Sequence, residues 1–163
     1  MSYLVIILPP PPKACDRNHG KHGIAAAGEN KRARLIAKAR TLETLRARGM
    51  DACDFKPCNI TLWMLDNSGR RDWDNAVSSF KHYQDGIFDA LGCDDRNIRA
   101  AQFAFCKHPG ISPRNAANGW FAVMLNDNIF SSFAYLDEME AMKEEARTEM
   151  ELALKDAAKE GRV

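Results

Sequence analysis

Apolar residues form four short runs that have the length and composition of β-strands. The first run covers residues 3–8 (YLVIIL) and stops at four prolines, which cannot donate to a sheet. Three further runs cover residues 59–65, 97–106 and 119–125. Residues 13–28 and 109–118 lack periodicity and carry Gly, Pro, Asn or charged residues, so they are expected to be loops. The pattern therefore predicts four strands.

Two segments between these runs have helical periodicity. Residues 29–48 lack Gly and Pro and end at Gly49, and their apolar positions recur at three- and four-residue steps. The stripe predicted to face the core consists of Leu35, Ile36, Ala39, Leu42 and Leu45. A second helix is predicted from about residue 73 to residue 91. Its expected core side consists of Val77, Phe80, Ile87, Phe88 and Leu91.

A third helix is predicted over residues 133–160, which lack Gly and Pro and are rich in Glu, Ala, Met and Lys. Its apolar stripe consists of Leu136, Met139, Met142, Ala146, Met150 and Ala157. Packing against the body of the protein and pairing with another subunit both fit this stripe. The order of elements predicts an α/β (α+β) domain at residues 1–127, with a mixed sheet of about four strands flanked by two helices. Residues 128–163 are expected to form a C-terminal helical extension.

The 163 residues carry a formal net charge of +1, but the charge is unevenly distributed. Residues 1–50 hold ten basic and three acidic side chains, residues 51–132 hold eight and ten, and residues 133–163 hold five and nine. Hydrophobic residues make up 45% of the chain and charged residues 28%, as in ordinary globular proteins. A near-neutral total thus includes a basic first third, and this asymmetry favours an anionic partner.

The five cysteines are an odd number in a chain without a recognisable signal peptide or membrane-length apolar run. We therefore expect no disulfide framework, no membrane partner and a reducing cytoplasmic location. A zinc site is an alternative use of the soft ligands, although their spacing matches no common zinc finger. Those ligands are Cys15, His19, His22, Cys53 and Cys58.

Carboxylates are concentrated around the second helix. Asp72 and Asp74 precede or begin it, and Asp94 and Asp95 follow its end. In the simplest interpretation the first pair only caps the helix, with Asp74 or Asn75 as the N-cap. However, helical geometry places Asp74 on one face with four other polar residues, opposite the apolar side. These four residues are Ser78, Lys81, Asp85 and Asp89.

Clustered carboxylates repel one another unless a cation neutralises them. Hard oxygen ligands suit Mg²⁺ or Mn²⁺ better than zinc. Carboxylate-bound metal ions commonly support phosphodiester hydrolysis by activating water, and a nearby lysine balances charge on the phosphate. The cluster is therefore a candidate metal-dependent hydrolytic site.

The motifs of this region resemble the RusA family of Holliday junction resolvases, which are small phage or prophage endonucleases. The resemblance covers residues 3–127. It rests on DWDN at 72–75, Lys81, DGIFDALG at 85–92 and DD at 94–95, preceded by LPPPP at 8–12.

The resemblance implies a Mg²⁺-dependent homodimer, with Mn²⁺ as a substitute, that resolves four-way junctions by paired symmetric nicks. It would act in recombination and repair in the cytoplasm of a bacterial host. Asp72, Asp74 and Asp95 match the family's catalytic metal ligands, and Asp94 is a neighbouring candidate. The catalytic lysine stands four positions after the second aspartate in one branch, where this chain has Ser78. Lys81 matches a branch with longer spacing.

Branched DNA would be the anionic partner of the basic first third, because lysine and arginine neutralise phosphates without reading bases. The candidate contacts are Arg70, Arg71, Arg32, Arg34, Lys38, Lys13, Arg17 and Lys21. Two other functions remain open. One is a non-catalytic branched-DNA-binding or phage regulatory module of the same fold, and the other is a DxD metal–nucleotide transferase.

Overall fold

The computed structural model describes residues 3–12, 15, 24–69, 71–107, 119–127 and 134–159. The sheet is formed by β1 (Tyr3–Leu8), β2 (Asn59–Leu65), β3 (Ala100–Cys106) and β4 (Phe121–Asn126). Its spatial order is β1-β4-β2-β3, in which β4 is antiparallel to both β1 and β2 while β3 is parallel to β2. This mixed sheet confirms the predicted fold class.

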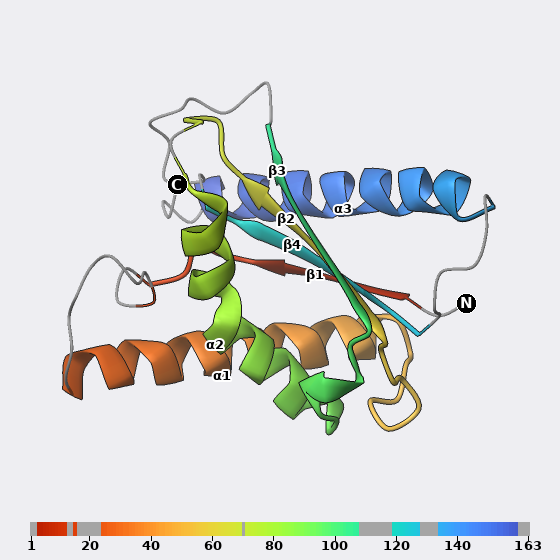
Figure 1. Ribbon diagram of the computed structural model, residues 1–163, viewed down its shortest axis with the longest axis horizontal. Helices are drawn as coiled ribbons and strands as arrows, with labels where there is room; N and C mark the ends of the chain where they lie inside the picture. The colour runs from red at the N-terminus through yellow and green to blue at the C-terminus, as the bar shows by residue number, and fades with distance from the viewer. Residues whose placement is uncertain are drawn as a thin grey trace.

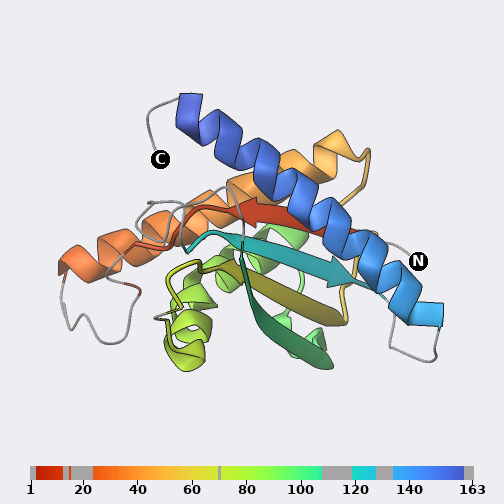
Figure 2. The same cartoon turned by 90° about the horizontal axis from the view of Figure 1, so that it is seen from above.

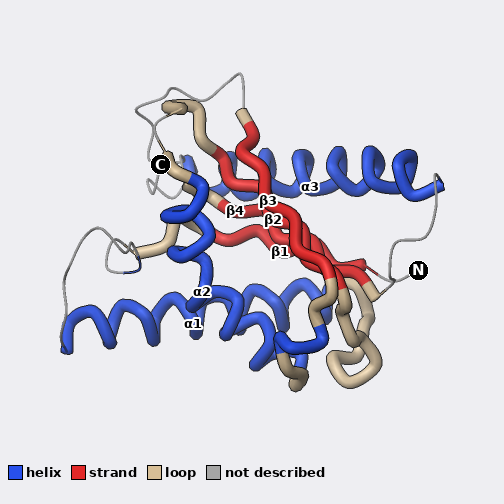
Figure 3. Tube along the Cα trace, in the orientation of Figure 1, coloured by secondary structure: helices blue, strands red, loops and turns tan. Residues whose placement is uncertain are grey.

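Three long helices cover the two faces of the sheet, as Figures 1 and 2 show from two directions. On one face lie α1 (Ile24–Ala47) and α2 (Trp73–Leu91), and on the other lies α3 (Ala134–Lys159). Figure 3 shows the sheet between these helical layers and the short 3₁₀ helix η3 (Asp95–Asn97) between α2 and β3. Within the described residues, no helix combines the length and apolar content needed to cross a membrane.

The two faces of the sheet bury separate apolar clusters. On the α1/α2 side, Leu4, Leu62 and Val123 from three strands pack with Phe80 and Ile87 of α2. On the α3 side, the second cluster includes Val5, Leu65, Trp120, Ala122, Met124, Ala146, Met150, Leu154 and Ala157. Because both faces are covered, all six residues of β4 are buried.

The described part of the apolar stripe of the C-terminal helix α3 packs against the body of the protein, which was one of the two uses considered for it. The predicted stripe residues Ala146, Met150 and Ala157 are buried. Leu154, which was not part of the predicted stripe, is buried as well. The side chains of Leu136, Met139 and Met142 lie outside the described residues.

The predicted start of the first helix was wrong, and its predicted apolar stripe was correct only in part, because Leu45 is buried and Ile36 and Leu42 are partly buried against the core. It begins at Ile24 rather than residue 29, and Gly28 lies within it. Leu35 is 55% exposed and Ala39 is also exposed, whereas Ala33, Ala37 and Thr41 are buried. The physical reason is the close contact with α2, where small side chains of α1 are the ones that fit.

The ends of β3 and β4 and the N-cap of α2 also differ from the predictions. The third strand begins at Ala100 rather than residue 97, because Asp94 accepts a hydrogen bond from the backbone N–H of Arg96 and starts η3. The fourth strand covers 121–126 rather than 119–125, after Gly119 at φ +102°. The N-cap of α2 is Asp72 rather than Asp74 or Asn75.

Gly86 gives a direct test of the helix contact. A Cβ atom at this position would lie 2.1 Å from the carbonyl oxygen of Arg34 and 3.0 Å from Cβ of Ala37. Because a backbone atom cannot move aside without displacing α1, we expect Gly86→Ala to lower the free energy of unfolding by about 1–3 kcal/mol or more. Urea denaturation measures this change.

Gly28→Ala is the matched control, since nothing lies within 4 Å of a Cβ atom there. Alanine favours a helix interior over glycine, so this variant is expected to gain about 0.5–1 kcal/mol. Equal losses in the two variants would contradict the proposed close approach.

Candidate functional site

The first two candidate aspartates lie at the start of α2 and are exposed. Asp72 has extended backbone angles (φ −82°, ψ 141°), and its side chain makes no capping hydrogen bond to the helix. Asn75 Nδ2 approaches Asp72 Oδ2 at 3.5 Å, and the backbone N–H of Asn75 donates to Asp74 Oδ1 at 2.9 Å. Asp72 thus holds the N-cap position without side-chain capping, which leaves its carboxylate facing solvent.

A buried aspartate shapes the turn that leads to this position. Asp66 follows β2 and is only 3% exposed. Its Oδ1 accepts hydrogen bonds from the hydroxyl and the backbone N–H of Ser68, and its Oδ2 accepts from the backbone N–H of Arg71 at 3.3 Å. Its own N–H donates to the carbonyl of Cys106 at 2.9 Å, which joins the turn to the end of β3.

The charge of Asp66 is stabilised despite its burial. Burial alone raises the pKa of this carboxyl, but the hydrogen bonds from Ser68 and Arg71 outweigh burial and leave the pKa below its ordinary value. The sequence interpretation missed Asp66 as a positioning residue. The signal was the Asp-x-Ser spacing directly after a strand, which is typical of an Asx turn.

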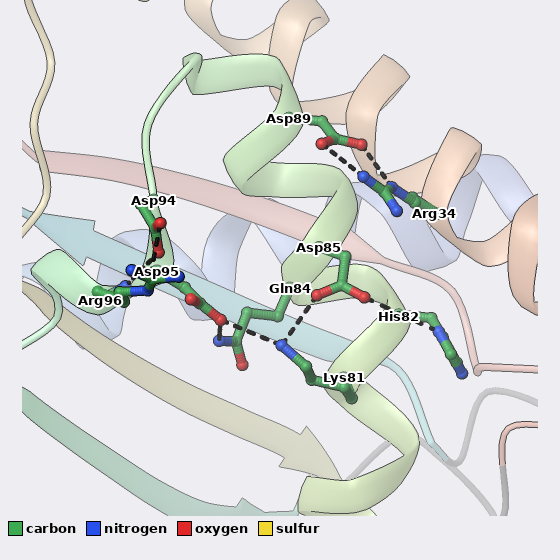
Figure 4. A network of polar contacts seen from close by, with 9 residues as sticks. All are labelled: Arg34, Lys81, His82, Gln84, Asp85, Asp89, Asp94, Asp95 and Arg96. Carbon is green, nitrogen blue, oxygen red and sulfur yellow. Dashed lines mark hydrogen bonds and ion pairs between the residues drawn. The ribbon is translucent and has the colours of Figure 1, made fainter.

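Lys81 of α2 and Asp95 of η3, which are 14 residues apart in the chain, are brought together (Figure 4). Lys81 Nζ lies 3.1 Å from Asp95 Oδ2 and 2.9 Å from Asp85 Oδ1. Gln84 Nε2 donates to the same Asp95 oxygen at 2.8 Å. The lysine therefore links a carboxylate of its own helix with one from η3.

This network shifts the pKa values of both partners. The hydrogen bond to Asp85, followed by that to Asp95, raises the pKa of Lys81 against the opposing effect of burial. The hydrogen bond from Lys81 in turn lowers the pKa of Asp95. Asp94 is held differently, because its carboxylate accepts from Arg96 N at 2.9 Å and lies 3.5 Å from Arg96 Nε.

Arg34, a candidate DNA contact, forms a bidentate ion pair with Asp89 of α2 (Figure 4). The Nε and Nη2 donors lie 2.5 Å and 2.7 Å from the two carboxylate oxygens. Hydrogen bonding from Arg34 lowers the pKa of Asp89. This guanidinium thus has a structural partner that offsets its charge.

The remaining candidates divide by location. Arg32 and Lys38 are exposed on α1, and Arg71 is exposed before α2, where a Cβ atom on Gly119 would lie 2.9 Å from its guanidinium. Four basic candidates and two zinc candidates lie outside the described residues, namely Lys13, Arg17, Lys21, Arg70, His19 and His22. The cysteines are all free, and Cys15 is buried with its thiol 3.3 Å from Asn30 Oδ1.

The candidate metal ligands fit Mg²⁺ in chemistry, because they offer carboxylate oxygens and three of the four, Asp72, Asp74 and Asp94, are exposed. Their arrangement provides fewer ligands than a complete site. Among the described residues, no three His, Cys, Asp or Glu side chains are grouped so that they could hold one metal ion. Asp72 and Asp74 are two positions apart in the chain, whereas Asp95 is bound to Lys81 and Gln84.

Comparison with known proteins adds no family assignment. The chain matches no known protein-family model and no curated protein.

Lys81→Ala tests the polar network without reference to activity. We expect the pKa of Asp95 to rise toward its ordinary value, because its main hydrogen-bond donor is lost. The pKa of Asp89 should stay unchanged in this variant. Titration of the aspartate carboxyl carbons by NMR measures both.

Arg34→Ala is the reciprocal control, because it should raise the pKa of Asp89 and leave that of Asp95 unchanged. If Asp95 titrates identically with and without Lys81, the contact between the two residues does not persist in solution.

Proposed function

We propose that this protein is a Mg²⁺-dependent endodeoxyribonuclease that resolves four-way DNA junctions by paired symmetric nicks. The observation that carries the proposal is the contact of Lys81 with Asp95 at 3.1 Å. The resemblance to RusA resolvases names both residues, and the fold brings them together from α2 and η3. The contact of Lys81 with Asp95 supports Lys81, rather than the position of Ser78, as the counterpart of the family's catalytic lysine.

The proposed roles follow from the exposure and charge of these side chains. Asp72 and Asp74, exposed at the start of α2, would hold the metal ion with Asp95 as a further ligand and Asp94 as its neighbour. A bound Mg²⁺ supplies an activated water and stabilises charge on the phosphate. Lys81 carries a positive charge that its two carboxylates maintain, and it would balance negative charge on the scissile phosphate.

Arg32, Lys38 and Arg71 are exposed basic residues that would bind the phosphate backbone. Two copies of the chain would make the paired cuts, since a twofold-symmetric enzyme suits a symmetric junction. We further propose a role in recombination and repair in the cytoplasm of a bacterial cell.

A nicking assay with a synthetic four-way junction, a linear duplex of the same sequence, and reactions with and without Mg²⁺ tests the proposal. Wild-type protein is expected to nick the junction symmetrically only with Mg²⁺ and to leave the duplex uncut. Asp74→Asn is expected to keep junction affinity within about twofold while losing cleavage at least about a hundredfold, because the amide keeps shape but loses the charged ligand.

Glu43→Gln, an exposed carboxylate on α1, is the control for loss of one acidic charge and should cut normally. Cleavage by Asp74→Asn at the wild-type rate would rule out the proposed role of this aspartate.

A non-catalytic junction-binding module is the second candidate. It is favoured by the lack of any group of three metal ligands among the described residues. The same assay separates the two candidates, because this module would bind the junction tightly without cutting it under any metal condition.

The phosphate-binding role can be tested by the salt dependence of junction affinity. Arg32→Ala is expected to weaken binding and to reduce the slope of log K against log salt by about 1, as one phosphate contact is lost. Arg34→Ala should leave the slope nearly unchanged, because Asp89 already offsets its charge. Fluorescence anisotropy across a salt series measures both slopes, and equal slopes in the two variants would refute this distinction.

A further inference from the structure

The strand β3 is an open edge of the sheet in the part of the chain that the structure describes. It pairs with β2 on one side, and no described strand pairs with its other side. Its sequence, AAQFAFC, contains no charged residue and no proline. Edge strands usually carry such residues to prevent pairing with another chain, so β3 lacks the common protection within its own length.

The side chains of β3 are also unusually accessible. Ala101, Gln102 and Ala104 are exposed and Phe105 is 40% exposed, with its ring packed against Phe103 at 5.0 Å between centroids. The opposite edge strand, β1, differs, since four of its six residues are buried beneath helices on both faces. Of the two edge strands that the structure describes, β3 alone combines an open backbone edge with exposed apolar side chains.

The backbone direction of β3 follows from one hydrogen bond. The carbonyl of Cys106 accepts from Asp66 N, so it points toward β2. Backbone groups of successive strand residues alternate in direction, which turns the N–H and C=O of Phe105 to the open side. Ala101 and Phe103 share this direction, which gives three outward residues centred on Phe103.

We propose that β3 pairs with β3 of a second copy of the chain in antiparallel fashion, about a twofold axis at Phe103. In this register Phe103 faces its own symmetry mate, and Ala101 faces Phe105 of the second copy. All three outward residues then form hydrogen-bonded pairs, which gives about six backbone hydrogen bonds. Registers centred on Gln102 or Ala104 leave one outward residue of β3 without a partner in the opposite β3.

The pattern of side chains explains why the partner is a second copy. Across the axis, each large Phe105 ring lies opposite a small Ala101, and on the other face Gln102 lies opposite Ala104. This self-complementary order of large and small residues is what a twofold interface requires. This pairing gives an interface to the homodimer of the proposed function. It rests on that function only for what the dimer does, because the surface itself is defined by β3.

The twofold axis is perpendicular to the sheet, because pairing at a shared edge continues the sheet without turning it over. Both copies of α2 then lie on one face of an eight-stranded sheet and both copies of α3 on the other. The two Lys81–Asp95 contacts would thus face the same side, where one DNA junction could reach both.

The ends of the paired strands carry like charges. Arg99 and Lys107 flank β3 and are exposed, so antiparallel pairing brings Arg99 of one copy and Lys107 of the second copy to the same end of the paired strands. Like charges that face each other weaken association, and salt screens them. The dimer is therefore expected to tighten, by about twofold or more, when ionic strength rises from about 50 to 300 mM.

Sedimentation equilibrium and amide hydrogen exchange on the full chain test the proposal. Wild-type protein is expected to sediment at twice the chain mass, with the amides of Ala101, Phe103 and Phe105 protected at high protein concentration and exposed on dilution. Ala101→Pro removes an outward N–H at an exposed residue and should weaken association at least about tenfold. Phe105→Lys should do the same by placing a charge at the interface.

Leu152→Lys, at a 54% exposed residue of α3, is the matched control and should remain dimeric. Circular dichroism and thermal unfolding establish that each variant is folded. A monomer at about 100 µM wild-type protein, or a Phe105→Lys variant as dimeric as Leu152→Lys, would overturn the proposal.

A dimer whose β3 amides stay unprotected would also overturn the proposed surface while leaving the homodimer intact. The proposed nuclease fails separately, if a β3-paired dimer binds or cuts no junction.

Discussion

The close approach of α1 and α2 at Gly86 is the constraint on which the rest of this face depends. Gly86 lies directly against the backbone of Arg34, and Ala37 is the nearest side chain. This contact leaves little freedom for α2 to rotate about its axis. Phe80 and Ile87 are turned toward the sheet as a result, while Lys81 is turned away from it. A packing constraint thus decides which polar side chains reach solvent.

Two polar contacts reinforce the same arrangement. The ion pair between Arg34 and Asp89 joins α1 and α2 beside Gly86. The buried hydroxyl of Tyr83 donates to the carbonyls of Pro9 and Pro10 at 3.1 and 3.3 Å, which holds the segment after β1 against α2. On the other face of the sheet, Arg48 binds Glu145 and lies 5.0 Å over the Tyr3 ring, so α3 is held to β1 and to the turn that follows α1.

How much the sequence could predict depended on whether a signal was local. The strand at 59–65 and the helix at 73–91 were predicted with the observed bounds, because a run of strand-forming residues and a helix ended by Gly92 are local patterns. The stripe of α1 was not predictable in this way, since Ala37 is buried where α2 brings Gly86 close to it. Small residues carry no periodic signal of their own until their partner is known.

In the candidate site, too, contacts within one helix were predictable and contacts between elements were not. Helical geometry placed Lys81 and Asp85 on one face, and the structure confirms that they are in contact at 2.9 Å. The approach of Asp95 depends on how η3 turns after Gly92, which helical spacing cannot describe. Asp66 was missed because its role lies in the turn it organises through Ser68 and Arg71.

The fold also changes what the basic first third can contribute. Its ten basic residues include Arg34, Arg40 and Arg48, which are paired with Asp89, Glu43 and Glu145. Among described residues, Arg32 and Lys38 form no ion pair, so they keep their full charge for an external anion. Any phosphate affinity from α1 must therefore come from fewer residues than the sequence count suggests, and from the side of the helix that those residues occupy.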